Sequence, residues 1–385
     1  MKAVFDSRWI YERPSGIGVY AREMMERLPS LLPEIDFVFL FSDPALERRH
    51  MDALAGRGNV ESALFPHGPL SPGSQLRLPG LLRQLKPAIF HTPNYMMPFL
   101  AFPVFRRRRA RKSIVNIHDV IPLVVEGYAP HSRTSRFRAV FRFCLAQSIR
   151  RADIVVTGSE ASRRDMIASL ALRKREAAKI QVVYDGAGGR LGEREPDPVK
   201  TDADTPRTLL YVGRMDPYKN VHGLVGAFAQ ARGLVPFPLR LVVCGPLDDR
   251  YPEARETARR LGVSGDVQFT GFVSDEALAR LYATADLLVH PSRYEGFGLQ
   301  LVEAMKSGLP VCCTDGGSQP EIAGDAAVVV KAGDAPAMAA AVADILGDPA
   351  KQARMKAAGL ERARLFGWDV CAERTAALYR TLLTP

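Results

Sequence analysis

The feature that most constrains the fold of this chain is the alternation of short apolar segments with longer helical ones. In the first half, the largely apolar runs are residues 3–5, 35–41, 87–91, 113–118, 152–157 and 179–183. In the second half they are residues 208–212, 239–244, 267–270, 286–290, 310–313 and 327–330. Continuous apolar runs between helices are typical of parallel strands that helices cover on both faces. The chain is therefore predicted to be α/β, with two similar parallel sheets.

One segment interrupts this alternation and divides the chain. Residues 186–207 have no periodic apolar pattern and are rich in Gly, Pro and charge, which is typical of a linker. With 385 residues, the chain is long enough for two domains. The predicted parts are an N-terminal domain (1–190), a linker (191–206), a C-terminal domain (207–365) and a C-terminal helix (366–385) that packs back on the first domain. A large ligand is expected beyond the carboxyl ends of the strands, between the two domains.

The segment from Asp286 to Cys313 carries the strongest chemical signal. It predicts a buried strand, a turn with Glu295, and a helix that begins near Phe297 between two glycines. Such a junction offers backbone N–H groups and the positive end of a helix dipole to an anion. Glu303 follows two turns later, on roughly the same side as Glu295. The pattern fits a ligand with a diphosphate in the middle and hydroxyls at both ends, although both glutamates could also be ordinary helix carboxylates.

Three further places could contact such a ligand. Arg214 and Lys219 follow the strand 208–212 and could clamp a diphosphate, although a solvated turn with two cations is equally compatible. Gly16 lies in a Gly-Ile-Gly turn that could approach a phosphate closely, although a simple tight turn favours the same residues. His118 ends a strand of the first half and could donate to a sugar hydroxyl, or could be a satisfied histidine of the sheet.

The positive charge of the chain is concentrated in one region. The net charge is +10, and residues 101–180 hold 18 Lys and Arg against 6 Asp and Glu. This region contains the basic run 106–112 and a predicted helix over 133–151, which carries Arg136, Arg138 and Arg142 beside an apolar face. Such a helix favours an anionic membrane surface, while a core-packed helix with a solvated arginine face is the alternative. Nothing in the region resembles a nucleic-acid recognition motif, so no nucleic-acid partner is expected.

Several classes of protein are disfavoured. An acidic residue at position 6 and the absence of a long apolar run near the N-terminus argue against a signal peptide, and the most apolar loop is too short to span a bilayer. The five cysteines have no metal-binding spacing. Free thiols in a reducing cytoplasm are therefore expected, with no metal site.

Taken together, these segments resemble the retaining glycosyltransferases of family 4 (GT4). That family has the GT-B fold, in which two Rossmann-like parallel-sheet domains face each other across a cleft. Its hallmark is two glutamates separated by seven residues, which Glu295-GFGLQLV-Glu303 matches. The SGIG, IHD, VGR…KN, GFVSD and DGGSQPEI segments follow the family order along the chain. The chain departs from many relatives at 184–186, where Tyr-Asp-Gly replaces an Asn-Gly pair.

The resemblance implies a role for each candidate residue. Arg214 and Lys219 would bind the donor diphosphate, and Gly16 would approach the same phosphates from the other domain. Glu295 would lie beside the donor sugar, which His118 would contact from the N-terminal domain. These residues, without Gly16, form the implied catalytic set. The other implied donor-binding residues are Gly296, Phe297, Gly298 and Leu299 at the helix start, Glu303 at the ribose, and Phe272 and Val273 near the base.

The resemblance also implies a reaction without a cofactor or metal. The segments look most like bacterial mannosyltransferases that use GDP-mannose to build O-antigen or exopolysaccharide. A retaining transfer of mannose to a glycan or polyprenyl-diphosphate-linked acceptor is therefore expected, in the cytoplasm or on the inner face of the plasma membrane. UDP-glucose and UDP-N-acetylglucosamine remain open as donors. The alternatives are another sugar-nucleotide enzyme of this fold, such as an epimerase or a phosphorylase, and a non-catalytic binding protein.

Overall fold

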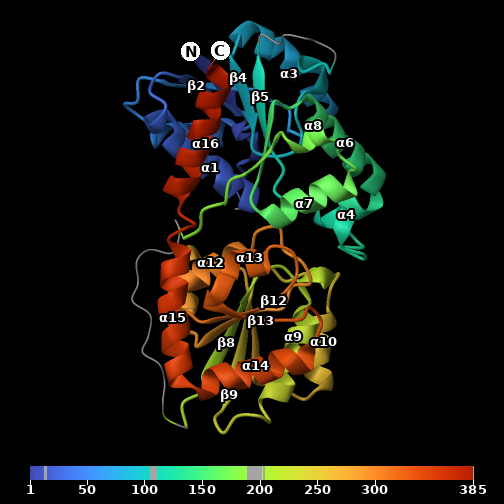
Figure 1. Ribbon diagram of the computed structural model, residues 1–385, viewed down its shortest axis with the longest axis vertical. Helices are drawn as coiled ribbons and strands as arrows, with labels where there is room; N and C mark the ends of the chain where they lie inside the picture. Colours follow the sequence, from blue (N-terminus) through green and yellow to red (C-terminus); the bar gives the residue numbers. More distant parts are fainter. Residues whose placement is uncertain (13–14, 105–110, 189–201, 203, 385) are drawn as a thin grey trace. The chain divides into compact units, whose positions relative to one another are not determined.

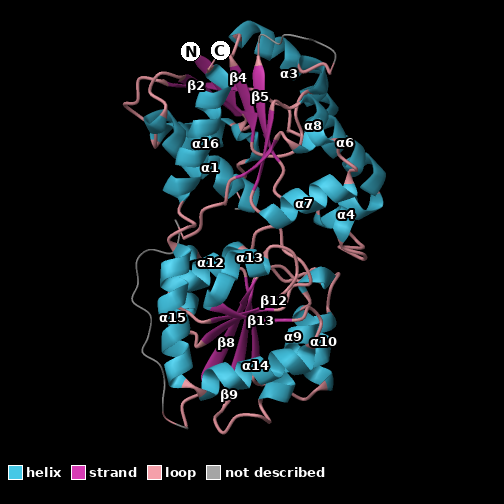
Figure 2. Ribbon diagram, in the orientation of Figure 1, coloured by secondary structure: helices cyan, strands magenta, loops and turns pink. Residues whose placement is uncertain are grey.

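The chain forms two compact units, each built on its own parallel sheet (Figures 1 and 2). The computed structural model describes residues 1–12, 15–104, 111–188, 202 and 204–384. The first unit contains Met1–Val120, Phe137–Gly186 and Trp368–Pro385, and the second contains Ile121–Arg136 and Ala187–Gly367. The sequence placed residues 121–136 in the first domain, whereas they group with the second unit. Most of the predicted linker, and the arginines at 106–109, lie outside the described residues.

The first sheet has seven parallel strands in the order β3-β2-β1-β4-β5-β6-β7. The strands are β1 (Lys2–Phe5), β2 (Asp36–Phe41), β3 (Val60–Leu64), β4 (Ile89–Thr92), β5 (Lys112–Asn116), β6 (Ile154–Thr157) and β7 (Ile180–Val182). The helices of this unit are α1 (Gly16–Leu31), α2 (Pro44–Asp52), α3 (Pro72–Leu85), α6 (Arg138–Arg151), α7 (Glu160–Ser169), α8 (Lys174–Ala177) and α16 (Trp368–Leu383). Two single-turn 3₁₀ helices, η1 (Ser7–Trp9) and η2 (Phe99–Ala101), follow β1 and β4.

The helix α16 returns the end of the chain to the first unit, beside α1 (Figure 1). Its buried residues Trp368 and Tyr379 belong to the same apolar core as Phe5 of β1. The contact with Trp368 is close, because a Cβ atom on Gly186 would lie 2.4 Å from the indole. The glycine of the Tyr-Asp-Gly segment is therefore the residue that lets this helix dock.

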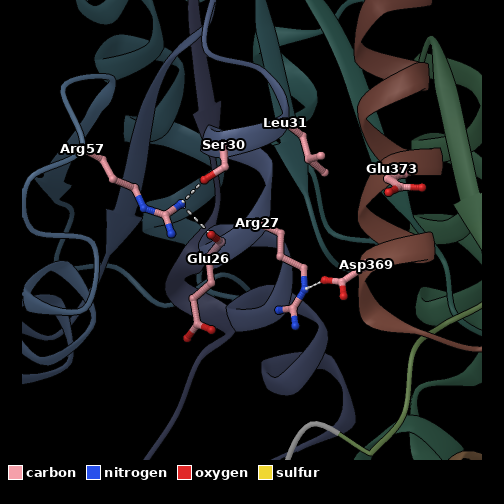
Figure 3. Close-up of a pocket in the computed structure, with 7 residues that line it drawn as sticks. All are labelled: Glu26, Arg27, Ser30, Leu31, Arg57, Asp369 and Glu373. Atoms are coloured by element: carbon pink, nitrogen blue, oxygen red, sulfur yellow. Dashed lines mark hydrogen bonds and ion pairs between the residues drawn. The ribbon is translucent and has the colours of Figure 1, made fainter.

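Polar contacts also join α16 to α1, around a pocket of about 460 Å³ (Figure 3). The Nε atom of Arg27 on α1 donates to Asp369 on α16 over 2.7 Å. Arg57, which precedes β3, donates to the carbonyl oxygen of Glu26 over 2.7 Å and to Ser30 over 2.9 Å. The remaining lining residues are Leu31 and Glu373. None of the predicted site residues lines this pocket, and its charged groups hold the two helices and the nearby loop together.

The second sheet has six parallel strands in the order β10-β9-β8-β11-β12-β13. The strands are β8 (Arg207–Val212), β9 (Leu239–Cys244), β10 (Val267–Gly271), β11 (Leu287–His290), β12 (Val311–Thr314) and β13 (Ala327–Val330). The helices of this unit are α4 (Ile121–Val124), α5 (Arg133–Arg136), α9 (Val221–Ala231), α10 (Glu253–Arg260), α11 (Asp275–Thr284), α12 (Leu299–Lys306), α13 (Gln319–Ala323), α14 (Ala335–Gly347) and α15 (Pro349–Ala363). Two 3₁₀ turns, η3 (Pro217–Lys219) and η4 (Gly324–Ala326), complete it. Buried side chains of β8, β9, β11, α9 and α14 form its core.

The prediction of one continuous basic helix over 133–151 was wrong. It is divided into α5 and α6, and the two pieces belong to different units. The predicted apolar face is also only partly buried, because Cys144, Leu145 and Ile149 pack inside while Phe137 and Val140 are exposed. The C-terminal half of α6 is thus partly buried in the unit, and apolar side chains at and just before its N-terminal end face solvent. All five cysteines are buried free thiols, as predicted.

Candidate active site

Three predicted site residues of the second unit follow the two strands between which its strand order reverses. Strand β8 pairs with β9 on one side and with β11 on the other, both in parallel. In open α/β sheets, ligands bind outside the carboxyl ends of the strands at this switch point. The segments 213–220 and 291–298 follow β8 and β11 directly. They carry Arg214, Lys219 and Glu295, so the sheet itself brings these residues to one place.

Two close backbone contacts shape the segment after β8. Gly213 has a φ of +153°, and a Cβ atom there would lie 2.7 Å from the hydroxyl oxygen of Tyr211. Gly245, which follows β9, has a φ of +147°, and its Cβ atom would lie 1.9 Å from the carbonyl oxygen of Gly213. Only glycine fits such positions. The Tyr211 hydroxyl then donates to the carbonyl oxygen of Arg214 over 2.6 Å, which fixes the turn that leads to Lys219.

Lys219 and Glu295 form a buried ion pair at the centre of the site. Their exposed fractions are 8% and 5%, and the lysine Nζ lies 2.6 Å and 2.8 Å from the two carboxylate oxygens. Burial alone raises the pKa of Glu295, but Lys219 and a hydrogen bond from His290 outweigh it and hold that pKa well below its ordinary value. Burial lowers the pKa of Lys219, but Glu295 more than compensates, so it is raised overall. Both groups are therefore charged at neutral pH.

His290 is a third member of this cluster that the sequence analysis missed. It ends β11, its side chain is fully buried, and its ring stacks on that of Tyr211 with 6.0 Å between the centroids. Its Nε2 atom lies 2.8 Å from Oε1 of Glu295, and the Ser292 hydroxyl lies 3.2 Å from the same nitrogen. In the sequence, His290 directly precedes Pro291 and Ser292, which is typical of a residue that shapes a turn. The sequence did hold one signal for its place in the cluster: it is a polar residue at the end of a fully buried strand, five positions before Glu295.

The backbone of Glu295 is held by the glycine-rich segment after β12. Glu295 forms an isolated parallel bridge with Gly317. The Ser318 hydroxyl donates to the carbonyl oxygens of Glu295 and Phe297, over 3.1 Å and 2.9 Å. Gly317 has a φ of +66°, and a Cβ atom there would lie 2.3 Å from the carbonyl oxygen of Glu295. The DGGSQPEI segment thus acts as a support for the Glu295 turn.

The helix after Glu295 begins two residues later than predicted. The helix α12 starts at Leu299 instead of Phe297, because its N-cap, Gly298, adopts a left-handed conformation with a φ of +91°. Gly296, Phe297 and Gly298 are buried, while Leu299 is half-buried. The Phe297 ring packs edge-on against Phe366, with 5.8 Å between the centroids. The predicted helix start is therefore present, and a glycine sets its position.

Glu303 lies on α12 and has a partner from a distant segment. The hydroxyl of Tyr282, on α11, donates to Oε2 of Glu303 over 2.8 Å. Burial and the nearby carboxylate raise the pKa of Tyr282 well above its ordinary value, so this hydroxyl stays protonated. The hydrogen bond from Tyr282 thus holds the half-buried carboxylate of Glu303 in a fixed orientation. Tyr282 carried no distinguishing signal in the sequence, because it is one aromatic residue of an amphipathic helix.

The other predicted contacts of the second unit are more exposed. The exposed Arg214 side chain pairs with the buried carboxylate of Asp216, with 2.9 Å between Nε and Oδ2. Phe272 and Val273 follow β10 and precede α11. Phe272 is 71% exposed, which is unusual for a phenylalanine in a folded protein. Arg214 and Phe272 therefore present a cation and an aromatic ring to solvent.

His118 and Gly16 belong to the first unit. His118 follows β5, and its Nδ1 lies 3.6 Å from a carboxylate oxygen of Asp185, while its Nε2 lies 3.0 Å from the carbonyl oxygen of Pro93. Burial lowers the pKa of His118, but Asp185 and the carbonyl outweigh it, so the pKa is raised. Gly16 is the first residue of α1, and a Cβ atom there would meet nothing within 4 Å. The Tyr-Asp-Gly departure thus supplies a partner for His118.

Residues 121–136 add a contact to the second unit that the sequence did not predict. Ile121 forms a small apolar cluster with Tyr218 and Tyr294. The ring of Tyr128 lies 5.1 Å from that of Tyr218, centroid to centroid. Tyr218 directly precedes Lys219, and Tyr294 directly precedes Glu295. Residues 121–136, although they come from the first half of the sequence, therefore pack on both loops that carry the buried ion pair.

Comparison with known proteins identifies the family. Residues 14–187 match the model "Glycosyltransferase Family 4", and residues 193–362 match "Glycosyl transferases group 1". This chain belongs to the family 4 glycosyltransferases. A curated relative, O-antigen chain mannosyltransferase B of Escherichia coli, is 29% identical over 99% of this chain and 100% of its own length. The family inferred from the Glu295 to Glu303 motif is thus confirmed.

Solved structures place the glycosyltransferase in the GT-B fold. Sucrose-phosphate synthase from Thermosynechococcus elongatus has a TM-score of 0.75 and 21% identity, over 99% of this chain and 98% of that one. Anabaena HepE, in complex with UDP and glucose, has a TM-score of 0.71 and 20% identity, over 99% of this chain and 100% of that one. The prediction of two Rossmann-like parallel-sheet domains is confirmed.

Two further observations concern the part of the glycosyltransferase that the structure describes. There, no group of three or more His, Cys, Asp or Glu side chains is arranged to hold a metal ion. No helix among the same residues is long and apolar enough to cross a membrane.

Proposed function

We propose that this glycosyltransferase moves a hexose, with mannose favoured, from a nucleotide-diphosphate sugar to a hydroxyl group of a glycan or lipid-linked acceptor, with retention of configuration and without a metal. The N-terminal domain would bind the acceptor, and the C-terminal domain would bind the donor. The relative that matches over the full length is an O-antigen mannosyltransferase, which supports mannose, GDP-mannose and cell-surface polysaccharide. HepE in complex with UDP supports a nucleotide-diphosphate sugar as the donor class.

The observation that carries this proposal is the buried cluster of Lys219, Glu295 and His290 at the switch point of the second sheet. Ligands of open α/β sheets generally bind at such a point, which supports a site here. The cluster holds a charged carboxylate and an ammonium group together out of water. A buried ion pair is costly to maintain, and perturbed groups of this kind gather at functional sites. The site thus combines a cation with a carboxylate held in place. A charged leaving group needs the first, and the hydroxyl groups of a sugar need the second.

The cations would stabilise the leaving group. Cleavage of the anomeric bond leaves an oxocarbenium-like sugar and a nucleoside diphosphate. Lys219, Arg214 and the N-terminus of α12 would offset the negative charge as it develops on the diphosphate. Gly16 would approach the same phosphates from the other domain. The acceptor hydroxyl would then attack from the face that the diphosphate leaves, with a phosphate oxygen as the base, and configuration would be retained.

Glu295 would orient the sugar instead of attacking it. Both of its oxygens already accept hydrogen bonds from Lys219, and one also accepts from His290. A carboxylate with so low a pKa is a weak base and a weak nucleophile. We therefore assign Glu295, with the backbone of 296–299, to the hydroxyl groups of the donor sugar. His118 would contact the same sugar from the first domain.

The rest of the donor would lie along α11 and α12. Glu303, held by Tyr282, is assigned to the ribose hydroxyls, because a carboxylate oxygen accepts hydrogen bonds from them. Phe272 and Val273 are assigned to the base. The exposed ring of Phe272 offers a flat apolar surface on which a base can stack.

An anionic membrane surface is proposed as a partner. Phe137, Val140 and Phe143 are 57%, 57% and 58% exposed near the start of α6. Arg138 and Arg142 are exposed on the same helix. Exposed apolar side chains beside cations suit the headgroup region of an anionic bilayer. The protein would then act in the cytoplasm, on the inner face of the plasma membrane, where a polyprenyl-diphosphate-linked acceptor is available.

A donor screen tests the function. The purified protein is heated alone and with GDP-mannose, UDP-glucose or UDP-N-acetylglucosamine, because a ligand that binds only the native state raises the melting temperature. We expect the largest increase with GDP-mannose. The donor so identified is then incubated with candidate acceptors. Transfer with an unchanged anomeric configuration supports the proposal, whereas conversion of the sugar nucleotide without an acceptor would indicate an epimerase.

A substitution at Glu295 tests the site. We expect E295Q to reduce transfer by about 100-fold or more, because a neutral amide cannot replace the buried carboxylate in either its charge or its contacts with Lys219. The matched control is E361Q, which changes an exposed glutamate on α15 that pairs only at the surface. Full transfer by E295Q would reject this role and would favour a binding protein without catalysis.

A further inference from the structure

The orientation of the His290 ring is unusual for a buried histidine. Its side chain is fully buried. Its Nε2 atom faces the carboxylate of Glu295 at 2.8 Å, whereas no partner is present for its Nδ1 atom among the described residues. Buried polar atoms in native proteins nearly always have a hydrogen-bond partner, and an exception requires an explanation. Here the explanation lies in the hydrogen bond that the other ring nitrogen, Nε2, makes with Glu295.

The contact with Glu295 fixes the tautomer. Because Glu295 is ionised, Nε2 must carry the hydrogen atom and donate it. The other tautomer would oppose a lone pair to a carboxylate and would also bury an unpaired N–H group. The ring therefore leaves Nδ1 without a partner among the described residues and directs its N–H group at the carboxylate 2.8 Å away, with the Ser292 hydroxyl at 3.2 Å from the same nitrogen. Its stacking on Tyr211 keeps that hydrogen bond in a fixed direction.

The two donors to Glu295 differ in how firmly they are held. The ammonium group of Lys219 has three N–H donors on a flexible stem, and contacts from it reach both oxygens of Glu295. In the proposed function, Lys219 must also meet the donor diphosphate, so its hydrogen bonds to Glu295 are shared or exchanged during binding. His290 has no such second task. It lies at the end of the buried strand β11, and its ring cannot turn without losing the stacking on Tyr211.

We propose that His290 is the positioning residue that keeps the Glu295 carboxylate aimed at the donor sugar while Lys219 turns to the diphosphate. This inference rests on the proposed function of Glu295 and Lys219. It assigns different roles to the two groups that contact Glu295. Lys219 neutralises its charge and responds to the ligand, and His290 sets its direction throughout the reaction.

Three substitutions separate this role from a packing role. In H290Q, the side-chain amide nitrogen can occupy the place of Nε2 and donate to Glu295. In H290N, the amide is too short to reach it. In H290F, the ring volume and the stacking on Tyr211 remain, but the donor is lost. H290F also removes the unpartnered Nδ1 atom, so it is expected to fold with a melting temperature close to that of the wild type. If it does not fold, the comparison of H290Q with H290N remains.

The readouts are turnover with the sugar nucleotide and binding of the nucleoside diphosphate alone, with GDP as the probe. We expect kcat to fall by about 10- to 100-fold in H290F and H290N, the effect of losing one hydrogen bond to a charged group. We expect H290Q to recover most of that loss. The Kd for GDP is expected to stay within about twofold of the wild-type value in all three, because GDP carries no sugar for Glu295 to orient.

Three outcomes would overturn the inference, and the third also overturns the proposed function on which it rests. Wild-type kcat in H290F and H290N would show that the hydrogen bond is not needed. An equal loss of kcat and GDP affinity in all three variants, H290Q included, would show that His290 only maintains the packing. If E295Q itself keeps full activity, the proposed function of Glu295 fails first, and the role of His290 fails with it.

Discussion

A buried histidine of the first unit gives a prediction whose size follows from the structure. His91, on β4, is fully buried and lies between two polar partners. Its Nδ1 atom is 2.9 Å from the Tyr379 hydroxyl on α16, and its Nε2 atom is 2.8 Å from Oδ1 of Asn116 on β5. Burial is the main influence on this ring and lowers its pKa from 6.5 to about 4, against a smaller opposite effect of Asn116. His91 is therefore neutral in the native state at neutral pH.

The direction of the pH effect follows from the two pKa values. When the pH falls below 6.5, the unfolded chain binds a proton at His91, but the native state does not until about pH 4. The native state is therefore progressively destabilised over this window. At about pH 5, the linkage relation gives a loss of about 2 kcal/mol relative to pH values well above 7. In H91Q this loss is absent, because glutamine does not titrate.

Tryptophan fluorescence provides a selective assay. The chain has two tryptophans, Trp9 and Trp368, and both lie in the first unit. Urea unfolding followed by this signal therefore reports the unit that contains His91. We expect the free energy of unfolding to fall between about pH 7.5 and pH 5 by about 2 kcal/mol more in the wild type than in H91Q. Other titrating groups cancel in this comparison. Equal losses in the two proteins would refute the reasoning.

Two other predictions use pairs of matched variants. G317A should reduce sugar transfer by about tenfold or more, because its Cβ atom would lie 2.3 Å from the carbonyl oxygen of Glu295 and would displace that turn. G333A is the control, because Gly333 also has a positive φ but open space around it; equal activity of the two variants would contradict the explanation. Glutamates in place of the three arginines 136, 138 and 142 should weaken binding to anionic liposomes by at least about 3 kcal/mol. Reversal of three other exposed arginines, Arg48 and Arg49 on α2 and Arg354 on α15, is the control in a co-sedimentation assay, and unchanged binding would exclude the membrane role.

The parts of the fold that were predictable are those with a continuous apolar signal. Strands buried on both faces are recognisable as apolar runs, and nearly all strands of both sheets were found in this way. The edge strand β3 was missed, because Glu61 and Ser62 on it are exposed and its sequence resembles a loop. The division of the basic helix was missed for a different reason. Its break, at Phe137, follows from the packing of 121–136 on the second unit, which no local pattern encodes.

The site was predictable where residue type and spacing carry the chemistry. Glu295 was singled out because it lies at a glycine-flanked helix start and its spacing from Glu303 matches a family motif. Lys219 was singled out because it follows a strand, although a solvated turn was equally compatible with its sequence. Their partners were not predictable, because each comes from a separate segment. Tyr282 bonds Glu303 from 21 positions away, and Asp185 reaches His118 from across the first unit. Such pairs depend on the completed fold.

The two sheets share a strand order around their first strands, but the cations that follow β1 and β8 are used differently. After β1, Asp6 and Arg8 form a buried bidentate pair, with both contacts at 2.6 Å. Arg8 also donates to the carbonyl oxygen of His67 and to Ser74. Four of the five N–H groups that a guanidinium carries are thus used inside the protein, and little remains for a phosphate. After β8, Lys219 has a flexible stem, and Glu295 is its one ion-pair partner among the described residues. This difference between Arg8 and Lys219 supports the proposal that the donor binds the second unit, since the strand order alone would allow either.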